Sequence, residues 1–115
     1  MTSDPNCLFC RIVKREIPAS IVHEDETVLA FRDIAPKAPT HLLVVPKRHL
    51  PKLSEAKDSD APLLGTVLGT LSRIAAKEGL TEYRVVVNNG ASAGQSVFHV
   101  HFHLMAGRAF AWPPG

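Results

Sequence analysis

Three histidines alternate with apolar residues near the C-terminus of the chain, at His99, His101 and His103. Alternate residues of a β-strand point to the same face of a sheet. The pattern therefore predicts a strand over 97–105 with the three rings on one side, about 6.6–7 Å apart. The apolar residues between them would face a core on the other side. This segment requires a sheet with a buried face. A metal site, or a surface strand that carries histidines by chance, are alternatives that the pattern leaves open.

The segment before this strand, residues 88–96, is a polar loop that contains Gly90 and Gly94. Such a loop can present several backbone N–H groups to one anion. Imidazole is neutral near pH 7 and serves both as a nucleophile and as a proton carrier. A row of imidazoles beside this loop predicts a site that handles a phosphate. The alternative is that residues 88–90 only form a turn.

The remaining sequence divides into short segments with helical or strand patterns, separated by prolines and polar turns. The predicted elements are a helix over 7–15, strands over 21–24, 27–31 and 41–45, a helix over 61–78 and a strand over 83–88. Together with the histidine strand they predict one domain, residues 1–115, with an α+β fold. We expect a mainly antiparallel five-stranded sheet with two helices packed on it.

The helix over 61–78 has sequence signals at both ends. Asp60, or the serine before it, can cap the N-terminus, Pro62 suits the first turn, and Gly79 can end the helix. Gly65 and Gly69 are either tolerated weak points or a flat strip that lets another helix, such as one of a second subunit, approach closely. The apolar stripe predicted to pack on the sheet comprises Leu63, Leu64, Val67, Leu68, Leu71, Ile74 and Ala75.

Charge and hydropathy argue against several classes of function. The formal net charge of the 115 residues is +2, too small to indicate a nucleic-acid or membrane partner. No apolar run is long enough to cross a bilayer, and the N-terminus lacks the basic and apolar regions of a secretory signal. We expect a protein of the cytoplasm, or also of the nucleus. Its cysteines would stay reduced there.

The histidine segment resembles the signature of the histidine triad (HIT) family, His-φ-His-φ-His-φ-φ with φ apolar. The match runs from His99 to Met105, although Ala106 rather than a large apolar residue follows. Further segments are similar to the Hint branch, the histidine triad nucleotide-binding proteins, and extend the resemblance over nearly the whole chain. These segments are FRDI at 31–34, PTH at 39–41, PKRH at 46–49, GQS at 94–96 and WPPG at 112–115.

The resemblance implies a homodimer with a sheet joined across two subunits. It also implies binding of the purine nucleotides AMP and GMP and hydrolysis of purine nucleoside phosphoramidates, such as adenosine 5'-monophosphoramidate or AMP-lysine. His101 would be the nucleophile and would form a nucleotidyl-histidine intermediate. His99, His103 and His41 would complete the histidine cluster. The implied phosphate and ribose contacts are Asn88, Gly94, Gln95 and Ser96, with Asp33 on the ribose hydroxyls. The implied base pocket consists of Leu8, Phe9, Ile12, Phe31 and Ile34, and Trp112 of a partner subunit would shape the leaving-group side.

The chemistry of the reaction is consistent with these residue types. A neutral imidazole suits attack on a phosphorus that carries negative charge, because the nucleophile is not itself an anion. Backbone N–H groups of 94–96, the amides of Asn88 and Gln95, and His103 are candidate donors to the transition state. The Ser96 hydroxyl is the candidate relay for the proton that the leaving amine needs. No acidic cluster lies near this loop in the sequence, which favours a reaction without a catalytic metal.

Cys7 and Cys10 supply half of a tetrahedral zinc site, and His49 and His99 can supply the rest. Some family members with these four residues bind zinc in this way, so the resemblance implies a closed structural site. Two alternatives stay open: the cysteines form a redox pair, or they pack as small apolar residues while His99 only supports His101.

Two other functions stay open at this point. One is hydrolysis of dinucleoside polyphosphates, or nucleotidyl transfer, as in related branches of the family. The Gln95–Ser96 pair and the C-terminal WPPG segment argue against it. The other is a nucleotide-binding adaptor whose slow hydrolysis is incidental.

Overall fold

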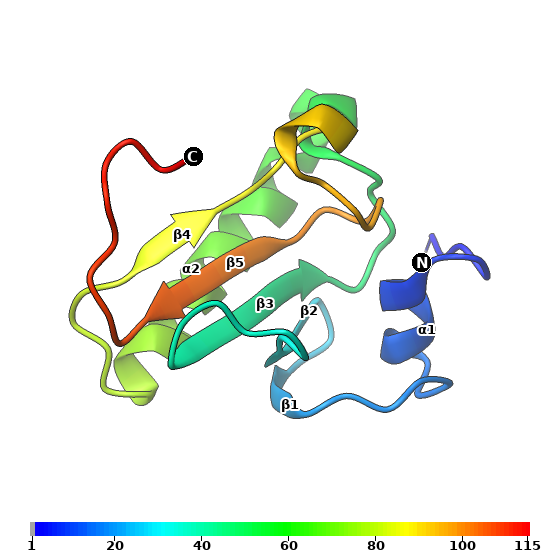
Figure 1. Cartoon of the computed structure of the whole chain (residues 1–115). Helices are drawn as coiled ribbons and strands as arrows, with labels where there is room; N and C mark the ends of the chain where they lie inside the picture. The colour runs from blue at the N-terminus through cyan, green and yellow to red at the C-terminus, as the bar shows by residue number, and fades with distance from the viewer. Residues whose placement is uncertain (1) are drawn as a thin grey trace.

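The computed structural model describes residues 2–115 and confirms the predicted α+β architecture (Figure 1). Within this range, five antiparallel strands form one sheet in the order β1-β2-β3-β5-β4. The strands are β1 (Ile21–Glu24), β2 (Val28–Arg32), β3 (Thr40–Pro46), β4 (Arg84–Val86) and β5 (Phe102–Ala106). The helices are α1 (Leu8–Val13) and α2 (Ala61–Lys77), and the loops contain short 3-10 turns at Leu53–Glu55, Asp58–Asp60 and Ala91–Ala93.

Helices α1 and α2 cover opposite faces of the sheet. Leu42 and Val44 of β3 pack in the core beneath α2, whereas Leu43 and Val45 of the same strand pack with Phe9 of α1. The alternation of side chains along a strand produces this division into two cores. Because α1 has only 6 residues, it covers part of its face and leaves room beside it. The room beside α1 is where the candidate site forms.

Helix α2 begins and ends close to the predicted positions. Pro62 lies in its first turn, and Gly79 follows its end with φ of 76°, a left-handed conformation that glycine adopts without strain. The predicted cap is wrong in one respect, because the Asp60 side chain makes no hydrogen bond to the helix. Its carboxylate instead accepts from the Lys57 N–H at 2.9 Å and pairs with Arg48. No helix within residues 2–115 meets the length and hydropathy of a membrane span.

The apolar stripe of α2 is confirmed for Val67, Leu71 and Ile74, which are buried against the sheet. Leu68 differs from the prediction, because its side chain is 44% exposed. Gly65 also faces open space, since nothing lies within 4 Å of the position that a Cβ would occupy there. This flank of α2 therefore points away from the sheet.

The strand predicted over 97–105 is too long at its N-terminal end. β5 begins only at Phe102, and residues 97–101 form irregular backbone before it. The side chains still alternate, because Val100 joins Phe102 in the core beneath α2. The regular ring spacing is wrong, however: the centroids of His101 and His103 are 5.0 Å apart. His99 is completely buried, so the three rings do not share one accessible face.

The C-terminal tail leaves β5 at Gly107 and runs against the loop before β3. Gly107 has φ of 99°, and a Cβ there would lie 2.8 Å from the Cβ of Pro39, so only glycine fits both the conformation and the contact. The next residue, Arg108, donates its Nε–H to the carbonyl of Lys37 at 2.9 Å. The tail and the loop at 37–39 are thus held together.

Candidate functional site

A cavity of about 340 Å³ opens beside α1 and brings together many of the residues expected from the sequence. Its lining includes His101, His103 and Ser96. The residues expected around the base and the ribose also line it: Leu8, Phe9, Ile12, Phe31, Asp33 and Ile34. Apolar walls and a few convergent polar groups are typical of small-molecule sites.

Several lining residues were missed by sequence reasoning. They are Ile17, Pro18, Ala19, Arg32, Leu43 and Val97. The stretch 17–19 belongs to the connection between α1 and β1, where no periodic pattern distinguishes a wall residue from an ordinary loop residue. Leu43 could have been found from strand alternation, because it lies on the same face of β3 as His41.

His101 is held as a neutral imidazole with a defined tautomer. Its Nδ1 lies 2.7 Å from the carbonyl oxygen of His99, and a carbonyl can only accept, so Nδ1 carries the proton and Nε2 keeps its lone pair. Burial lowers the pKa of His101 below the ordinary value. The ring of Phe9 packs edge-on against it, with the centroids 5.1 Å apart. The ring of His101 is thereby fixed in the cavity wall with an unprotonated Nε2.

His41 and His103 form a directed chain of hydrogen bonds. The Lys37 N–H donates to Nδ1 of His41 at 3.0 Å, so the hydrogen of that ring sits on Nε2. This Nε2–H donates to Nδ1 of His103 at 2.9 Å, which leaves the hydrogen of His103 on its own Nε2. Burial lowers the pKa of both rings, that of His103 to about 4, so both are neutral at pH 7. His103 therefore presents an N–H donor where it lines the cavity.

The loop at 88–96 differs from the predicted phosphate cradle at Gln95. This side chain is 3% exposed and serves the loop itself. Its Nε2 donates to the carbonyls of Pro51 and Val97, at 2.8 and 3.1 Å, and its Oε1 accepts from the Gly90 N–H at 2.8 Å. Both amide hydrogens are used, so the prediction that the Gln95 amide donates to a phosphate is wrong. Gln95 instead fixes the conformation of the loop.

Two of the three backbone N–H groups expected to face a phosphate are also engaged. Those of Gly94 and Gln95 donate to the carbonyls of Ala91 and Gly90, at 3.0 and 3.1 Å. Within residues 2–115, the N–H of Ser96 has no such partner. Ser96, with its exposed hydroxyl and this N–H, is the member of the loop that lines the cavity.

Five other expected residues do not line the cavity: Asn88, Gly94, Trp112 and the two histidines His41 and His99. Gly94 has φ of 106° and supports the half-buried side chain of Asn88, whose Nδ2 lies 3.5 Å from the position of a Cβ on the glycine. Trp112 is 83% exposed on the C-terminal tail. Within one chain, neither Asn88, Gly94 nor Trp112 belongs to the cavity wall.

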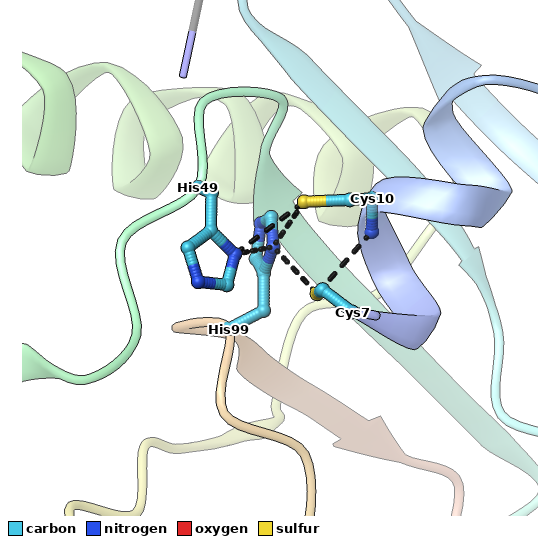
Figure 2. Close-up of side chains that lie close together, drawn as sticks. All are labelled: Cys7, Cys10, His49 and His99. Carbon is cyan, nitrogen blue, oxygen red and sulfur yellow. Dashed lines mark hydrogen bonds between the residues drawn. The ribbon is translucent and has the colours of Figure 1, made fainter. Parts of the chain in front are cut away.

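A second cluster lies behind the cavity, where α1 meets two loops. Figure 2 shows Cys7, Cys10, His49 and His99 pointing toward one another from α1, the loop after β3 and the segment before β5. Their ligand atoms all lie within 4.8 Å of one another. The four residues predicted to bind zinc are therefore assembled.

The spacing within this cluster fits a tetrahedral metal. Sγ of Cys10 lies 3.4 Å from Nδ1 of His49 and 3.5 Å from Nδ1 of His99, and the two nitrogens are 3.3 Å apart. Tetrahedral zinc, with bonds of about 2.3 Å to sulfur and 2.0–2.1 Å to nitrogen, would place sulfur and nitrogen about 3.6 Å apart and two nitrogens about 3.3–3.4 Å apart. The donor set and its spacing therefore suit zinc.

Polar contacts on the outer side of the histidines support this interpretation. Nε2 of His99 donates to the carbonyl of Pro46 at 2.7 Å, so its Nδ1 is the ligand atom. Nε2 of His49 faces the carboxylate of Asp4 at 3.9 Å. Burial raises the pKa of the Cys7 thiol to about 11, so the thiolate that zinc requires forms only with help from a cation.

A larger hollow of about 770 Å³ lies elsewhere, between residues 79–84 and 106–110. It contains no histidine or cysteine, although Arg84 and Arg108 flank Phe110 there. Chemistry, rather than size, therefore assigns the site to the smaller cavity with His101.

Comparisons with known proteins identify a matching domain family. The model of the HIT domain matches residues 14–110. The chain belongs to the HIT family. This HIT protein is 55% identical over 109 residues to an uncharacterized HIT-like protein of Synechococcus elongatus, covering 94% of this chain and 96% of the relative. It is 49% identical over 115 residues to a 14 kDa zinc-binding protein of Zea mays, covering 97% and 90%.

Among solved structures, the HIT protein is similar to a HIT family hydrolase from Legionella pneumophila, with a TM-score of 0.93 and 50% identity. The likeness covers 96% of this chain and 100% of that one. The family and the five-stranded fold predicted from the sequence are therefore confirmed.

Proposed function

We propose that this HIT protein hydrolyses the P–N bond of purine nucleoside phosphoramidates, conjugates of AMP with an amine. The observation that carries the proposal is the tautomer of His101, whose Nδ1–H donates to the His99 carbonyl and whose Nε2 is thereby free to attack. The solved relative from Legionella pneumophila is described as a hydrolase, which supports the same class of reaction.

The reaction would proceed in two displacements at phosphorus. Nε2 of His101 attacks, a P–N bond to the ring forms, and the bond to the leaving amine breaks while the amine receives a proton through the Ser96 hydroxyl. Water then attacks the nucleotidyl-histidine and gives its proton back through the Ser96 hydroxyl to solvent, the new bond to the ring breaks, and AMP is released with His101 neutral again. The N–H groups of His103 and Ser96 stabilise the negative oxygens in both transition states. These side chains supply the chemistry without a catalytic cofactor.

The nucleotide would lie along the cavity wall. The purine packs between the apolar side chains of α1 and those of β2 and the loop after it, including Ile34, which is 99% exposed in the free protein. The carboxylate of Asp33, 18% exposed, accepts the ribose hydroxyls. Apolar walls without base-specific donors suit either AMP or GMP.

We also propose that zinc occupies the Cys7, Cys10, His49 and His99 cluster as a structural ion. The ligand spacing supports this, as does the description of the Zea mays relative as a zinc-binding protein. Elemental analysis of protein purified without chelators should find about one zinc ion per chain. A chain without stoichiometric metal would contradict the assignment.

A homodimer is the third element of the proposal. Strand β4 is at the edge of the sheet, and Val85 on it is 38% exposed. The neighbouring Tyr83 and the outward flank of α2 with Leu68 are also exposed, at 39% and 44%. An open strand edge beside exposed apolar side chains favours pairing with a second copy. Analytical ultracentrifugation should show a dimer, and Val85→Pro, which cannot extend the ladder, should shift it toward monomer.

The decisive experiment is the His101→Ala variant. We expect it to bind AMP with nearly unchanged affinity and to lose at least about 10³-fold in AMP release from an AMP-amine conjugate. A variant that stays active would eliminate His101 as the nucleophile. A parallel assay with a dinucleoside polyphosphate separates the related activity, because preferential cleavage of that substrate by the native chain would overturn the phosphoramidase proposal.

A further inference from the structure

The segment at residues 2–6 contacts two of the four residues of the proposed zinc site. The backbone N–H of His49 donates to the carbonyl of Thr2 at 2.9 Å, and that of Cys7 donates to the carbonyl of Asp4 at 3.0 Å. Cys7 lies at the N-terminus of α1, whereas His49 lies in the loop after β3. The segment therefore ties together two ligands that are distant in sequence.

The side chain of Asp4 makes a further contact with the same site. Its Oδ1 accepts from the Asn6 N–H at 2.9 Å, which closes a tight turn in the segment. Its Oδ2 lies 3.9 Å from Nε2 of His49, while Nδ1 of that ring faces Sγ of Cys10. A carboxylate beside Nε2 favours the tautomer with the hydrogen on that nitrogen, because the negative charge attracts the N–H group. Nδ1 then keeps the lone pair that a metal requires.

The two histidines of the site differ in what holds them from the outer side. Nε2 of His99 donates to the carbonyl of Pro46 at 2.7 Å, and the side chain of His99 is completely buried. The side chain of His49 is 12% exposed, and within residues 2–115 Asp4 is the charged residue that faces its ring. His49 is therefore the histidine that zinc would lose first, and Asp4 is the residue placed to prevent this loss.

We propose that Asp4 is a positioning residue of the zinc site, which orients the imidazole of His49 toward the ion and slows the release of the ion. The inference rests on the proposed zinc site. Outer partners of metal ligands typically change metal affinity by about 10- to 100-fold. The carboxylate of Asp4 is 44% exposed and lies beyond hydrogen-bond distance from the ring, so the lower end of that range applies.

The test uses two substitutions that separate the charge of Asp4 from its turn. Asp4→Asn removes the charge and keeps an oxygen that can accept from the Asn6 N–H. Asp4→Glu keeps the charge on a longer side chain. Each zinc-loaded chain is mixed with an excess of a chromophoric zinc chelator, and the rate of zinc transfer is measured. Asp4→Asn should release zinc about 10-fold faster than the native chain. Asp4→Glu should restore most of the difference.

Asp25→Asn is the matched control. Asp25 also closes a turn, with its Oδ1 accepting from the Thr27 N–H at 2.8 Å, and its Oδ2 lies 2.8 Å from Nε2 of His23. His23 lies on β1 and is not a member of the proposed zinc site. Removal of this second charge should leave the rate of zinc transfer unchanged.

The Tm of each metal-free chain separates a role at the zinc site from a general role in folding. A residue that acts on zinc through His49 should change the rate of zinc transfer and leave the metal-free Tm at the native value. A metal-free Tm that falls in Asp4→Asn would mean that Asp4 stabilises the fold, which overturns the inference.

The remaining outcomes distinguish the role of Asp4 from the zinc site itself. If Asp4→Asn transfers zinc at the native rate, Asp4 has no positioning role, although the zinc site stands. If Asp4→Glu releases zinc as fast as Asp4→Asn, the charge is not what retains the ion, and the inference is wrong. If the native chain takes up no zinc, the proposed site fails and the role of Asp4 fails with it.

Discussion

The backbone carbonyl of His99 accepts the Nδ1 proton of His101 at 2.7 Å, while the side chain of His99 points into the Cys7–Cys10–His49 cluster. One residue therefore joins two sites: its ring is a candidate zinc ligand and its main chain sets the tautomer of His101, the proposed nucleophile. Phe9 reinforces the link, since it lies between the two cysteines in the sequence and packs on both rings, at 5.9 and 5.1 Å between centroids.

Removal of zinc should disturb the nucleophile as well as the fold. When a chelator strips the metal, the segment at 99–101 loses an anchor, and we expect kcat/KM to fall by about 10- to 100-fold together with a lower Tm. Nitrogen-15 NMR of the His101 ring measures the tautomer directly and should show exchange between the two forms. Readdition of zinc should restore both kcat/KM and the single His101 tautomer. Full activity and an unchanged spectrum in the metal-free protein would contradict the coupling.

The hydrogen-bond chain through His41 and His103 should affect turnover more than binding. His103→Phe removes a donor to the phosphate oxygens and should lower kcat by about 10²- to 10³-fold with little change in KM. His41→Phe removes the group that sets the tautomer of His103 and should lower kcat by a smaller factor. The control is His23→Phe on β1, whose ring pairs with Asp25 away from the cavity. Equal losses of kcat in all three variants would refute a role for the hydrogen bonds between His41 and His103.

Stability should decrease on acidification below the ordinary imidazole pKa. Burial lowers the pKa of His103 to about 4 in the folded chain, whereas an unfolded chain titrates near 6.5. Between these values the unfolded state binds a proton that the folded state does not, so the free energy of unfolding falls as pH drops from about 7 to 4. Urea unfolding at several pH values measures this slope. The slope should be shallower in His103→Gln.

The pH dependence of the rate has the same origin. Burial keeps the pKa of His101 below its ordinary value, so the neutral nucleophile persists on the acid side of pH 6.5. The acid limb of kcat/KM should therefore lie below that pH. An acid limb of kcat/KM at or above pH 7 would mean that His101 is protonated at that pH. This would contradict the pKa that its burial predicts.

The two cores should respond differently to truncation. Phe9→Ala and Leu71→Ala each remove a side chain that is at most 4% exposed, and each should cost about 2–5 kcal/mol of stability. Phe9 contacts His99 and His101, so its loss should also lower zinc affinity and kcat. Leu71 belongs to α2 and packs on the other face of the sheet, so its loss should change neither zinc affinity nor kcat at a temperature where the variant is folded. Metal titration and kinetics on both variants check this difference.

Sequence patterns predicted the elements of this fold well because each pattern has a physical cause that acts locally. The apolar run over 41–45 and the helical spacing over 61–78 report which side chains a sheet or a helix buries. The residues around His101 could be gathered because the whole ordered set resembles one family. The apolar wall from Phe9 to Ile34 was expected on that basis and lines the cavity.

The remaining details depend on contacts that no local pattern records. β5 begins only at Phe102 because its pairing with β3 starts there, opposite Val44. The role of Gln95 depends on the carbonyl of Pro51, which is distant in sequence. The orientation of His101 depends on a main-chain oxygen, which every residue possesses and no side-chain motif can reveal.

The contact between Gly107 and Pro39 has a consequence for His41 and His103. The same loop supplies the Lys37 N–H that fixes His41, and Arg108 holds the Lys37 carbonyl. A methyl group at position 107, or a molecule that binds the last residues, would displace the C-terminal tail. The loop that contains Lys37 would then move, and with it the N–H group that donates to His41. The C-terminal tail is therefore connected to the tautomer of His41 through one loop, although the tail does not line the cavity of its own chain.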